Sequence, residues 1–579
     1  MADPKTSVPD FFELKKNLKK DFSGLPRFRL AILGDSSTQF LHQAIRGYGY
    51  EVELNVEIYE SDYGQTDQEI FNAQARLYTF KPDGVFLFYS TQKLLSGFYS
   101  CNENERRSFA SDQVSKLRNS LAKLRQSLSC KIILSNFTEI DDGVFGNFGN
   151  KHPASFIFQL RKLNVALMEL AAEERDVFIN DISGLNARMG LGYSFQPKLY
   201  VNSDIVFSLE FTALVARNLV DIVLPMMGKL KKCLILDLDN TLWGGIIGDD
   251  GMENIQIGDL GIGKAYSQLQ QWALQLKHRG IILAVSSKNT ESIAREPFER
   301  HPDMVLRMDD ISVFVANWEN KADNIRYIQS ILNIGFDSMV FIDDNPFERE
   351  LVKKEIPGIT VPDLPEDPAK YLDFLRGLNL FETASYSEED AERTRQYREE
   401  AKRVVAQQSY SSQDEYLRSL QMTSAVKGFD SFNTPRVAQL TQRSNQFNLR
   451  TVRYTEGEIA ALITAPGAYT LSFDLKDSYG DHGLIAALIL KEQEGALFID
   501  TWVMSCRVLS RGMEQFIINQ IVNLAEKQKI SSVIGEYLPT QKNGIVKELY
   551  PSLGFVQDNG KWMLSVQDFK SFNTYIDAE

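Results

Sequence analysis

Short apolar runs alternate with longer helix-like stretches along most of the first 375 residues, and no other feature limits the possible folds as strongly. From residue 28 to about 227 the apolar runs are RLAILG, DGVFLFY, CKIILSN and DVFIND, and a second series contains CLILDLDNT, GIILAVSS and MVFIDD. Strand-length apolar runs that alternate with helices are typical of parallel sheets covered by helices on both faces. We therefore expect two successive α/β units.

The pattern changes in the last third of the chain. The runs AYTLSFDLKD, HGLIAALIL and ALFIDTWVMS favour antiparallel strands, with helices expected at 513–527 and near residue 546. Residues 386–419 are charged and contain neither Gly nor Pro, which favours a helical connector. The predicted domains are 1–227, 228–375 and 425–579, with the connector at 376–424.

Composition excludes several classes of protein. The chain has 579 residues, too many for one hydrophobic core, and 43% hydrophobic and 24% charged residues are ordinary for a soluble globular protein. A net charge of −14 would repel nucleic acid and anionic membranes. The sequence contains neither a signal-peptide core nor an apolar run of about 18 residues. We expect a cytoplasmic protein without nucleic-acid or membrane partners, and its widely spaced cysteines indicate a reducing compartment. They are Cys101, Cys130, Cys233 and Cys506.

Two carboxylates follow the apolar strand CLIL. Asp237 and Asp239 lie where an open parallel sheet has its ligand crevice. An ionised aspartate that faces a phosphoryl group can attack it in line and form an aspartyl phosphate. A second carboxyl group can protonate the leaving oxygen and then activate water. The sequence therefore predicts Asp237 as nucleophile and Asp239 as acid and base.

An anionic nucleophile that approaches a phosphate also needs cations. Asp343 and Asp344 follow the strand MVFI and are predicted to bind Mg²⁺ together with Asp237 and the carbonyl of Asp239. Lys321 and Ser287 are predicted to be catalytic. Each residue alone also fits a helix cap, a solvated turn or a surface charge, and the combination favours the site. The predicted phosphate-binding residues are Thr241, Ser286, Ser287, Lys288, Asn289 and Lys321.

The order DxDxT, Ser, Lys, Asp-Asp resembles the four motifs of the haloacid-dehalogenase (HAD) superfamily. The segments TLWGGIIGDDG, SSKN, WENKADNI and FIDDNPFERE narrow the resemblance to the FkbH-like subgroup, and QRSNQFNLRT, DSYGDHG, MSCRVLSRG and YPSLGF extend it over residues 231–555. The resemblance implies a magnesium-dependent phosphatase or phosphotransferase that acts through an aspartyl phosphate on a small, phosphoglycerate-like acid. It also implies transfer of a glyceryl-like acyl group to the thiol of an acyl-carrier protein or of coenzyme A.

Two features qualify this resemblance. Members of the subgroup often have a cysteine where this chain has Ser286, so an acyl intermediate on that thiol would be absent here or formed differently. The residues between 259 and 275 leave little room for a cap domain. We therefore expect an open cleft.

The segment CRVLSRGME follows the strand FIDTWVM and precedes an apolar-periodic helix. It resembles the R-x-x-G-x-G loop of GNAT acyltransferases, which binds the pyrophosphate of coenzyme A or a phosphopantetheine arm, although a plain strand-to-helix turn fits as well. Tyr550 in YPSLGF matches the GNAT tyrosine that protonates the departing thiolate. The resemblance assigns thioester binding to Arg507, Ser510, Arg511, Gly512 and Tyr550, with Ser510 in place of the first glycine.

Cys506 and His482 each have two interpretations. Arginines and a helix N-terminus would favour the Cys506 thiolate, which would then carry an acyl group, whereas a small core residue is the alternative. His482 in the predicted loop DSYGDHG is either a general base or a hydrogen-bonded structural residue.

The N-terminal unit contains Gly34-Asp35-Ser36-Ser37 after a strand, which resembles the nucleophile block of SGNH hydrolases. That chemistry needs a histidine to accept the serine proton. The expected D-x-x-H position corresponds to Asp204 and Phe207, and phenylalanine accepts no proton. We expect a hydrolase fold without hydrolase activity that serves as a binding or docking module.

The predicted architecture is multidomain α/β: a flavodoxin/SGNH-like domain, a HAD Rossmann-like domain with a minimal cap and a GNAT-like α+β domain. The predicted function is bifunctional, with phosphate cleavage or transfer coupled to acyl transfer. One alternative is a plain phosphatase whose terminal domains confer specificity. Another is a scaffold that binds an acyl-carrier protein.

Overall fold

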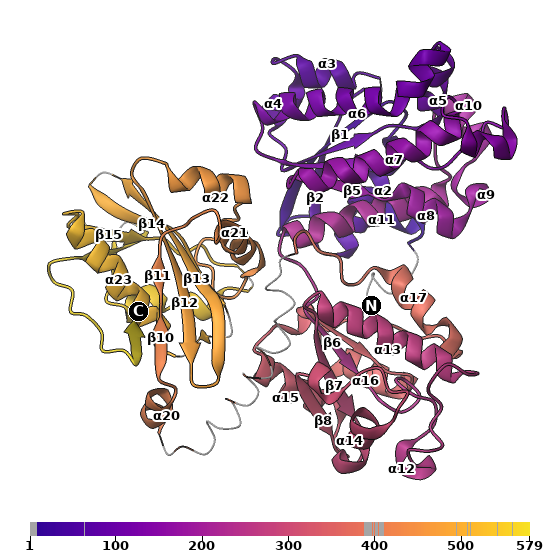
Figure 1. Ribbon diagram of the computed structural model, residues 1–579. Coiled ribbons are helices and arrows are strands. Elements are labelled where there is room, and N and C mark those ends of the chain that lie inside the picture. Colours follow the sequence, from indigo (N-terminus) through magenta and orange to yellow (C-terminus); the bar gives the residue numbers. More distant parts are fainter. Residues whose placement is uncertain are drawn as a thin grey trace. The chain divides into compact units, whose positions relative to one another are not determined.

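The computed structural model describes residues 9–62, 64–386, 397, 399, 403, 410, 412–493, 495–505, 508–509, 511–540, 542–558 and 560–579. The chain divides into two compact units, Met1–Leu224 and Pro225–Glu579 (Figure 1). Of the connector predicted at 376–424, most residues between 387 and 411 lie outside the described residues. None of the described helices combines the length and the apolar character needed to cross a membrane.

The first unit contains a five-stranded parallel sheet with the strand order β2-β1-β3-β4-β5. Its strands are β1 (Arg27–Gly34), β2 (Asn55–Glu60), β3 (Gly84–Phe88), β4 (Lys131–Ser135) and β5 (Val177–Asn180). Residues on one face of β1, β3 and β4 share a hydrophobic cluster with helices α6 and α7. On the opposite face Phe88 contacts Phe207, which precedes α11. The predicted α/β class of this unit is confirmed.

Helices connect the strands of this sheet, as expected when parallel neighbours are joined by crossovers. The longer ones are α2 (Gln39–Glu51), α6 (Glu103–Arg125), α7 (Phe156–Glu173) and α11 (Leu209–Met226). The shorter ones are α1 (Phe11–Asn17), α3 (Thr66–Phe71), α4 (Arg76–Phe80), α5 (Thr91–Tyr99), α8 (Ile182–Met189), α9 (Leu191–Ser194) and α10 (Pro197–Ser203).

The second unit begins with a four-stranded parallel sheet in the order β8-β7-β6-β9. Its strands are β6 (Cys233–Leu236), β7 (Ile282–Ser287), β8 (Val313–Ala316) and β9 (Met339–Ile342). Its helices are α12 (Ile247–Asp250), α13 (Gly263–His278), α14 (Glu291–Arg300), α15 (Lys321–Leu332), α16 (Pro346–Glu355) and α17 (Tyr371–Leu378). Buried clusters cover both faces, one with α13 and the other with α15. Only the short α12 lies between β6 and α13, in agreement with the predicted minimal cap.

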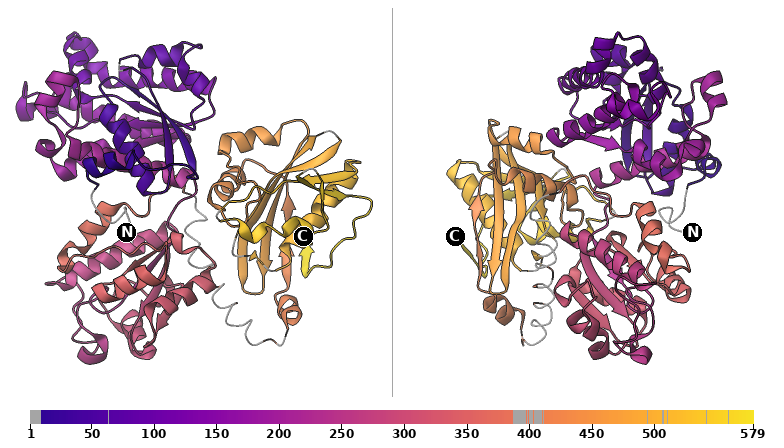
Figure 2. Two further views of the ribbon diagram at one scale, coloured as in Figure 1. Left: turned by 180° about the vertical axis from the view of Figure 1, so that it is seen from behind. Right: turned by 45° about the vertical axis from the view of Figure 1, so that its right-hand side comes forward.

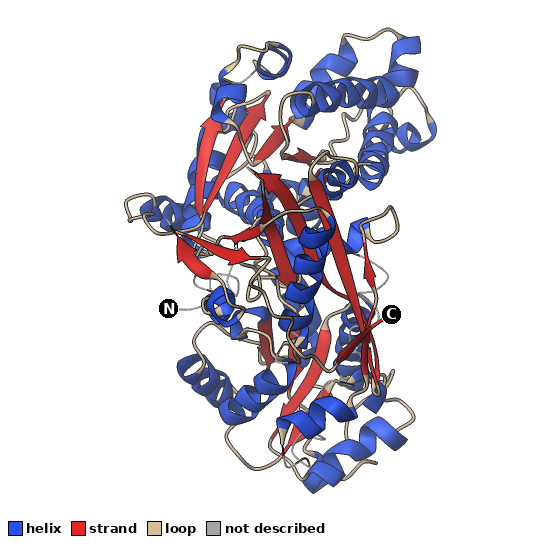
Figure 3. Ribbon diagram, turned by 90° about the vertical axis from the view of Figure 1, so that its left-hand side faces the viewer, coloured by secondary structure: helices blue, strands red, loops and turns tan. Residues whose placement is uncertain are grey.

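The end of the chain forms a larger, mostly antiparallel sheet, drawn in orange and yellow in Figure 2 and among the red arrows of Figure 3. Its strand order is β16-β17-β15-β14-β13-β12-β10-β18. Its strands are β10 (Met422–Ser424), β11 (Val426–Lys427), β12 (Ala468–Asp477), β13 (Gly480–Gln493), β14 (Ala496–Met504), β15 (Ser532–Gly535), β16 (Val556–Asp558), β17 (Lys561–Ser565) and β18 (Ile576–Ala578). Its helices are α20 (Gln413–Ser419), α21 (Thr434–Arg443), α22 (Glu456–Ile463), α23 (Met513–Lys527) and α24 (Leu549–Ser552). α23 packs on one face and α21 and α22 on the other, which confirms the predicted α+β arrangement.

Two predicted domain boundaries fall inside packed elements. Residue 375 lies within α17, and Leu378, Leu380 and Phe381 still belong to the core of the β6–β9 sheet. Residue 424 is the last residue of β10, which already pairs with β12 and β18. Burial of these apolar side chains extends the packed core of the β6–β9 sheet to Phe381, and Tyr416 already belongs to the core of the last sheet.

Candidate active site

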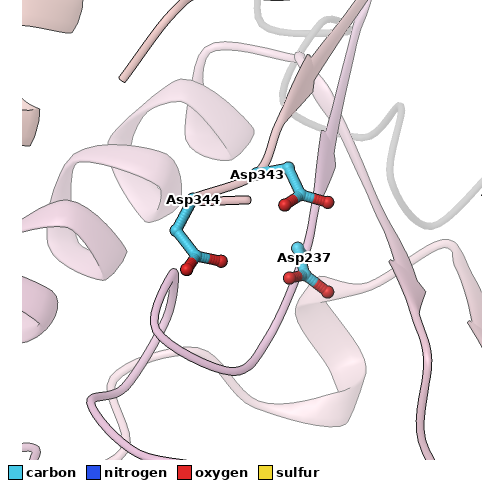
Figure 4. Close-up of side chains that lie close together, drawn as sticks. All are labelled: Asp237, Asp343 and Asp344. Atoms are coloured by element: carbon cyan, nitrogen blue, oxygen red, sulfur yellow. The ribbon is translucent and has the colours of Figure 1, made fainter. Parts of the chain in front are cut away.

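Three carboxylates converge at the carboxyl edge of the β6–β9 sheet. Strands β6 and β9 are neighbours in a register that places Leu236 beside Ile342, so Asp237 and Asp343 emerge side by side. The Asp237 amide donates to the carbonyl of Ile342 at 3.0 Å. Carboxylate oxygens of Asp237, Asp343 and Asp344 lie within 4.8 Å of one another (Figure 4). The structure brings together the three carboxylates that were predicted to bind Mg²⁺.

Lys321 lies between two of these carboxylates. It is the first residue of α15, its side chain is 4% exposed, and its Nζ is 2.9 Å from Asp237 Oδ1 and 2.5 Å from Asp343 Oδ2. Burial alone would lower the pKa of Lys321, but the two carboxylates outweigh it and hold the pKa above its ordinary value. The ammonium group is therefore a fixed cation beside the predicted nucleophile.

The carboxylates carry more negative charge than Lys321 offsets. Burial, followed by the charge of Asp237, raises the pKa of Asp344 to about 6 and raises the pKa of Asp343 in the same direction. A hard divalent cation with oxygen ligands would neutralise this excess, and Mg²⁺ is usually bound in this way by a few carboxylates. The donor set therefore fits the predicted magnesium ion.

Asp239 is held by three donors. Its Oδ1 accepts from Trp243 Nε1 at 2.9 Å and from the Ile247 amide at 3.0 Å, and its Oδ2 accepts from Asn289 Nδ2 at 2.8 Å. Burial raises the pKa of Asp239, and these hydrogen bonds oppose that shift. A carboxyl group fixed in this way, two residues beyond Asp237, suits the predicted role in proton transfer.

Thr241 links the loops after β6 and β9. Its Oγ1 accepts from the Asp344 amide at 3.1 Å, and its side chain is fully buried. Asn240, which directly precedes Thr241 in the turn after β6, has a positive φ of 54°. Thr241 therefore positions Asp344, and its predicted contact with phosphate remains a prediction.

Four of the predicted phosphate-binding residues, Ser286, Ser287, Lys288 and Asn289, lie at or just beyond the end of β7. Ser286 and Ser287 are the last residues of the strand, whereas the sequence placed them after it. Both are buried, and among the described residues the Ser286 Oγ has no hydrogen-bond partner. Lys288 Nζ lies 2.6 Å from Glu348 Oε1, and Asn289 binds Asp239. Their predicted phosphate contacts are not tested by these geometries.

Sequence reasoning missed Trp243, Glu348 and Arg349. Trp243 and Glu348 bind predicted site residues, and Arg349 Nη1 donates to the carbonyls of Asp343 and Asp344. Glu348 and Arg349 lie in the segment PFERE, directly after the paired aspartates. Charged residues in the first turns of a helix usually face solvent, so nothing in the sequence indicated that Glu348 and Arg349 lie at the site. Their burial in the structure shows that they belong to it.

The predicted thioester loop is described only in part. Cys506, Arg507 and Ser510 lie outside the described residues. Gly512 has a φ of 80° and precedes α23, which leaves a helix N-terminus at the predicted place. The Arg511 side chain is buried, with Nη1 3.3 Å from Asp477 Oδ2 and 3.1 Å from His482 Nε2. Its guanidinium therefore faces an aspartate in this structure.

His482 and Tyr550 are also buried. His482 lies in β13 and not in the predicted loop, because β13 begins at Gly480, and its Nε2 is 2.9 Å from Asp477 Oδ2. Burial lowers the pKa of His482. Tyr550 is 1% exposed beside Gly535 of β15, and burial raises the pKa of its phenol. Neither residue presents an accessible acid or base in this conformation.

One edge of β14 is covered by the chain itself. β14 pairs with β15 only at Leu497 and Phe498. Further along, Asn448 bridges Val503, and the Met504 amide donates to the Phe447 carbonyl at 3.2 Å. This segment lies next to the predicted thioester loop, where an extended ligand would otherwise find free backbone groups.

The predicted serine site of the first unit is closed. Ser36 is fully buried, and its Oγ is 2.8 Å from Asp35 Oδ1 and 3.0 Å from Ser90 Oγ. The Ser37 amide donates to the carbonyl of Asp204 at 3.0 Å, so the two predicted blocks do meet. Phe207 packs against Phe88, with ring centroids 5.5 Å apart, where a hydrolase would need its histidine.

The fold and the carboxylate cluster define a multidomain α/β protein with an oxygen-rich cation site at a parallel-sheet edge. A family model, FkbH, N-terminal domain, matches residues 29–224. The N-terminal part of the protein BF1531 from Bacteroides fragilis, which contains a phosphatase domain complexed with Mg, is 48% identical with a TM-score of 0.63. The match covers 65% of this chain and 100% of that one. The chain belongs to the FkbH-like family.

Two acetyltransferase structures align with a quarter of the chain. They are the ribosomal-protein-S18-alanine N-acetyltransferase from Escherichia coli, at 14% identity over 94% of its length, and spermidine N-acetyltransferase from Vibrio cholerae in complex with CoA and spermine, at 13% over 96%. Both TM-scores are 0.20, so our description of the last sheet rests on its own strand order. No curated protein matches the sequence.

Proposed function

We propose that this chain is a magnesium-dependent, HAD-type phosphatase or phosphotransferase that acts through an aspartyl phosphate on a small phosphorylated acid. The arrangement that carries the proposal is Lys321 Nζ between Asp237 and Asp343, with Asp344 in the same cluster. Family membership and the magnesium-bound phosphatase domain of the Bacteroides relative support it.

The residues divide the reaction into two steps. Asp237 attacks the phosphorus, the bond to the leaving oxygen breaks, and Asp239 gives that oxygen its proton. Asp239 then takes a proton from water, which attacks the phosphorus and releases Asp237 and inorganic phosphate. Lys321 offsets negative charge beside the nucleophile in both steps. Asp237, Asp343, Asp344 and the carbonyl of Asp239 would hold a magnesium ion, which when bound would supply further positive charge for the phosphoryl oxygens.

We further propose that phosphate cleavage is coupled to transfer of a glyceryl-like acyl group to the thiol of a carrier protein or of coenzyme A. Two features support this second activity: the helix N-terminus at Gly512, and the resemblance of MSCRVLSRG and YPSLGF to the FkbH-like subgroup. The N-terminal unit, in which Phe207 replaces the expected histidine, would serve as a docking module.

The alternative is a plain phosphatase whose terminal domains confer specificity. Three observations favour it: Arg511 faces Asp477, Tyr550 is buried, and one edge of β14 is covered by Phe447 and Asn448. A thioester arm would have to displace some of these contacts.

One experiment separates the two. The full chain is incubated with phosphoglycerates and Mg²⁺, with and without a phosphopantetheinylated carrier protein, and released phosphate and carrier mass are measured. Coupled transfer predicts a carrier-dependent release and an acylated carrier. An equal rate of phosphate release with and without the carrier, and no acyl adduct on the carrier, would favour the plain phosphatase. No magnesium-dependent release from any phosphorylated acid would contradict both.

A further inference from the structure

Arg349 is a buried charge beside the predicted magnesium ligands. It lies in α16, and its residue is 7% exposed. A single nitrogen, Nη1, donates to the Asp343 carbonyl at 2.8 Å and to the Asp344 carbonyl at 2.6 Å. Burying a guanidinium is costly, so an arginine in this place is expected to have a specific role.

The two carbonyls, of Asp343 and Asp344, belong to the turn whose backbone conformation orients the carboxylates of the same two residues. Immediately beyond β9 the chain leaves strand geometry, and the direction of each side chain depends on the backbone torsions of these residues. Asp343 is also held through its carboxylate, because Oδ2 accepts from Lys321 and Oδ1 accepts from the Asn345 amide at 2.8 Å. Asp344 is held mainly through its backbone: its amide donates to Thr241 Oγ1, its carbonyl accepts from Arg349, and its Oδ1 lies 3.5 Å from Thr241 Oγ1.

Resting on the proposed function, we propose that Arg349 is a positioning residue for the magnesium site: its guanidinium fixes the Asp343–Asp344 turn so that both carboxylates face Asp237. It is not a metal ligand: its Nη1 donates to two backbone carbonyls, and its Nε lies 3.6 Å from Asp363 Oδ1. Both contacts to the carbonyls come from one nitrogen of a rigid, planar guanidinium, whereas the ammonium of a lysine is a point charge on a flexible chain. Residues that orient metal ligands in this way typically contribute about 10–100-fold to metal affinity.

The test measures Mg²⁺ binding directly. Isothermal titration calorimetry of the full chain without substrate compares the wild type with Arg349→Gln and Arg349→Lys. We expect about 10–100-fold weaker binding for Arg349→Gln, and a smaller but measurable loss for Arg349→Lys. Arg326→Gln is the matched control, because Arg326 lies on α15 and its ion pairs within the described part of the chain are with exposed or half-buried acids, Asp323 and Glu355. Its Mg²⁺ affinity should equal that of the wild type.

A steady-state experiment supplies the second measurement. If Arg349 positions ligands, the Mg²⁺ concentration for half-maximal phosphate release rises while kcat at saturating Mg²⁺ stays within a few-fold of the wild type. Wild-type Mg²⁺ affinity in both Arg349 variants would overturn the inference and leave the proposed function intact. A wild-type protein that binds no Mg²⁺ would overturn the proposed function itself. If Arg349→Gln fails to fold, as judged by circular dichroism, unchanged affinity in Arg349→Lys is decisive against the inference.

Discussion

At the scale of single residues, the phosphoryl-transfer account gives Asp237 and Asp239 separate tasks. Asp239→Asn preserves shape but removes the proton donor of the first step and the base of the second, so attack on phosphorus is slowed and hydrolysis of the phosphoenzyme fails. We expect turnover to fall by about 10²–10⁴-fold and a phosphorylated enzyme to accumulate, seen as one added phosphoryl group by intact-mass spectrometry. Near-normal turnover, or a lack of any phosphoenzyme under acid quench, would contradict this division of roles.

Asn289 allows the pKa of Asp239 to be changed without altering Asp239. The hydrogen bond from Asn289 favours the ionised carboxylate and opposes the effect of burial on its pKa. In Asn289→Ala the pKa of Asp239 should rise, and because Asp239 must be protonated to act as an acid, the fall in kcat/KM at high pH should move to higher pH. A pH–rate profile measures this. A raised KM with no displacement of that limb would instead support the phosphate contact predicted for Asn289.

At the scale of elements, a buried cluster of charged side chains joins the end of β12 and the start of β13 to neighbouring segments. Its members are Asp477, His482, Arg403 and Arg511. Asp477 accepts from Arg403 at 2.8 Å and lies within 3.3 Å of both His482 and Arg511. Burial would raise the pKa of Asp477, but hydrogen bonds from His482 and Arg403 outweigh it and hold the pKa far below its ordinary value. A carboxylate with a depressed pKa stabilises the folded state above its unfolded pKa of about 3.9, and that contribution fades as the pH falls further.

Asp477→Asn should therefore lower the free energy of unfolding by about 3–5 kcal/mol at neutral pH, with the deficit shrinking below about pH 4. Denaturant unfolding at several pH values measures it. Asp481→Asn is the control, because Asp481 is half exposed and lies 3.9 Å from Lys476, so its loss should change stability little. A deficit for Asp477→Asn that is the same at pH 3 and pH 7 would rule out the charge-based explanation.

The N-terminus of α23 is the second element under test. Gly512 has a φ of 80°, and a bulky side chain there would obstruct the approach of a phosphate to the helix amides. Gly512→Val should abolish calorimetric binding of coenzyme A or a phosphopantetheinylated carrier while phosphate release persists. Gly495→Val carries the same strain at a φ of 78° between β13 and β14 and should still bind. If the wild type binds neither ligand, the plain-phosphatase alternative takes precedence.

Sequence patterns were informative where chemistry and secondary structure coincide locally. The segments CLIL-DLDNT and MVFI-DD each combine a buried strand with carboxylates at its end, so the convergence of Asp237, Asp343 and Asp344 could be expected from strand order alone. Arg349 and Trp243 could not be found in this way. Their roles arise from hydrogen bonds to a carbonyl or to a carboxylate that only the folded chain brings within reach.

Other errors have a common cause in long-range pairing. Asp481 and Gly483 around His482 suggested a loop, yet the strand extends through them because Asp481 pairs with Lys476 of β12. The predicted boundary at residue 424 coincides with the end of β10, which pairs with β12 and β18, two strands that are distant in sequence. The residues of a short segment do not indicate which distant strand it will pair with. The ends of strands and of domains were therefore the features hardest to predict from the sequence.

At the scale of the whole molecule, phosphate cleavage requires Asp237 as the nucleophile, whatever the terminal domains contribute. Its side chain is 8% exposed and paired with Lys321, so Asp237→Asn removes the nucleophilic charge with almost no change of volume. Magnesium-dependent phosphate release from phosphoglycerates, measured on wild type and Asp237→Asn at equal folded concentration, tests this directly. The account predicts loss of release to background in the variant. Release at a rate near that of the wild type would contradict it.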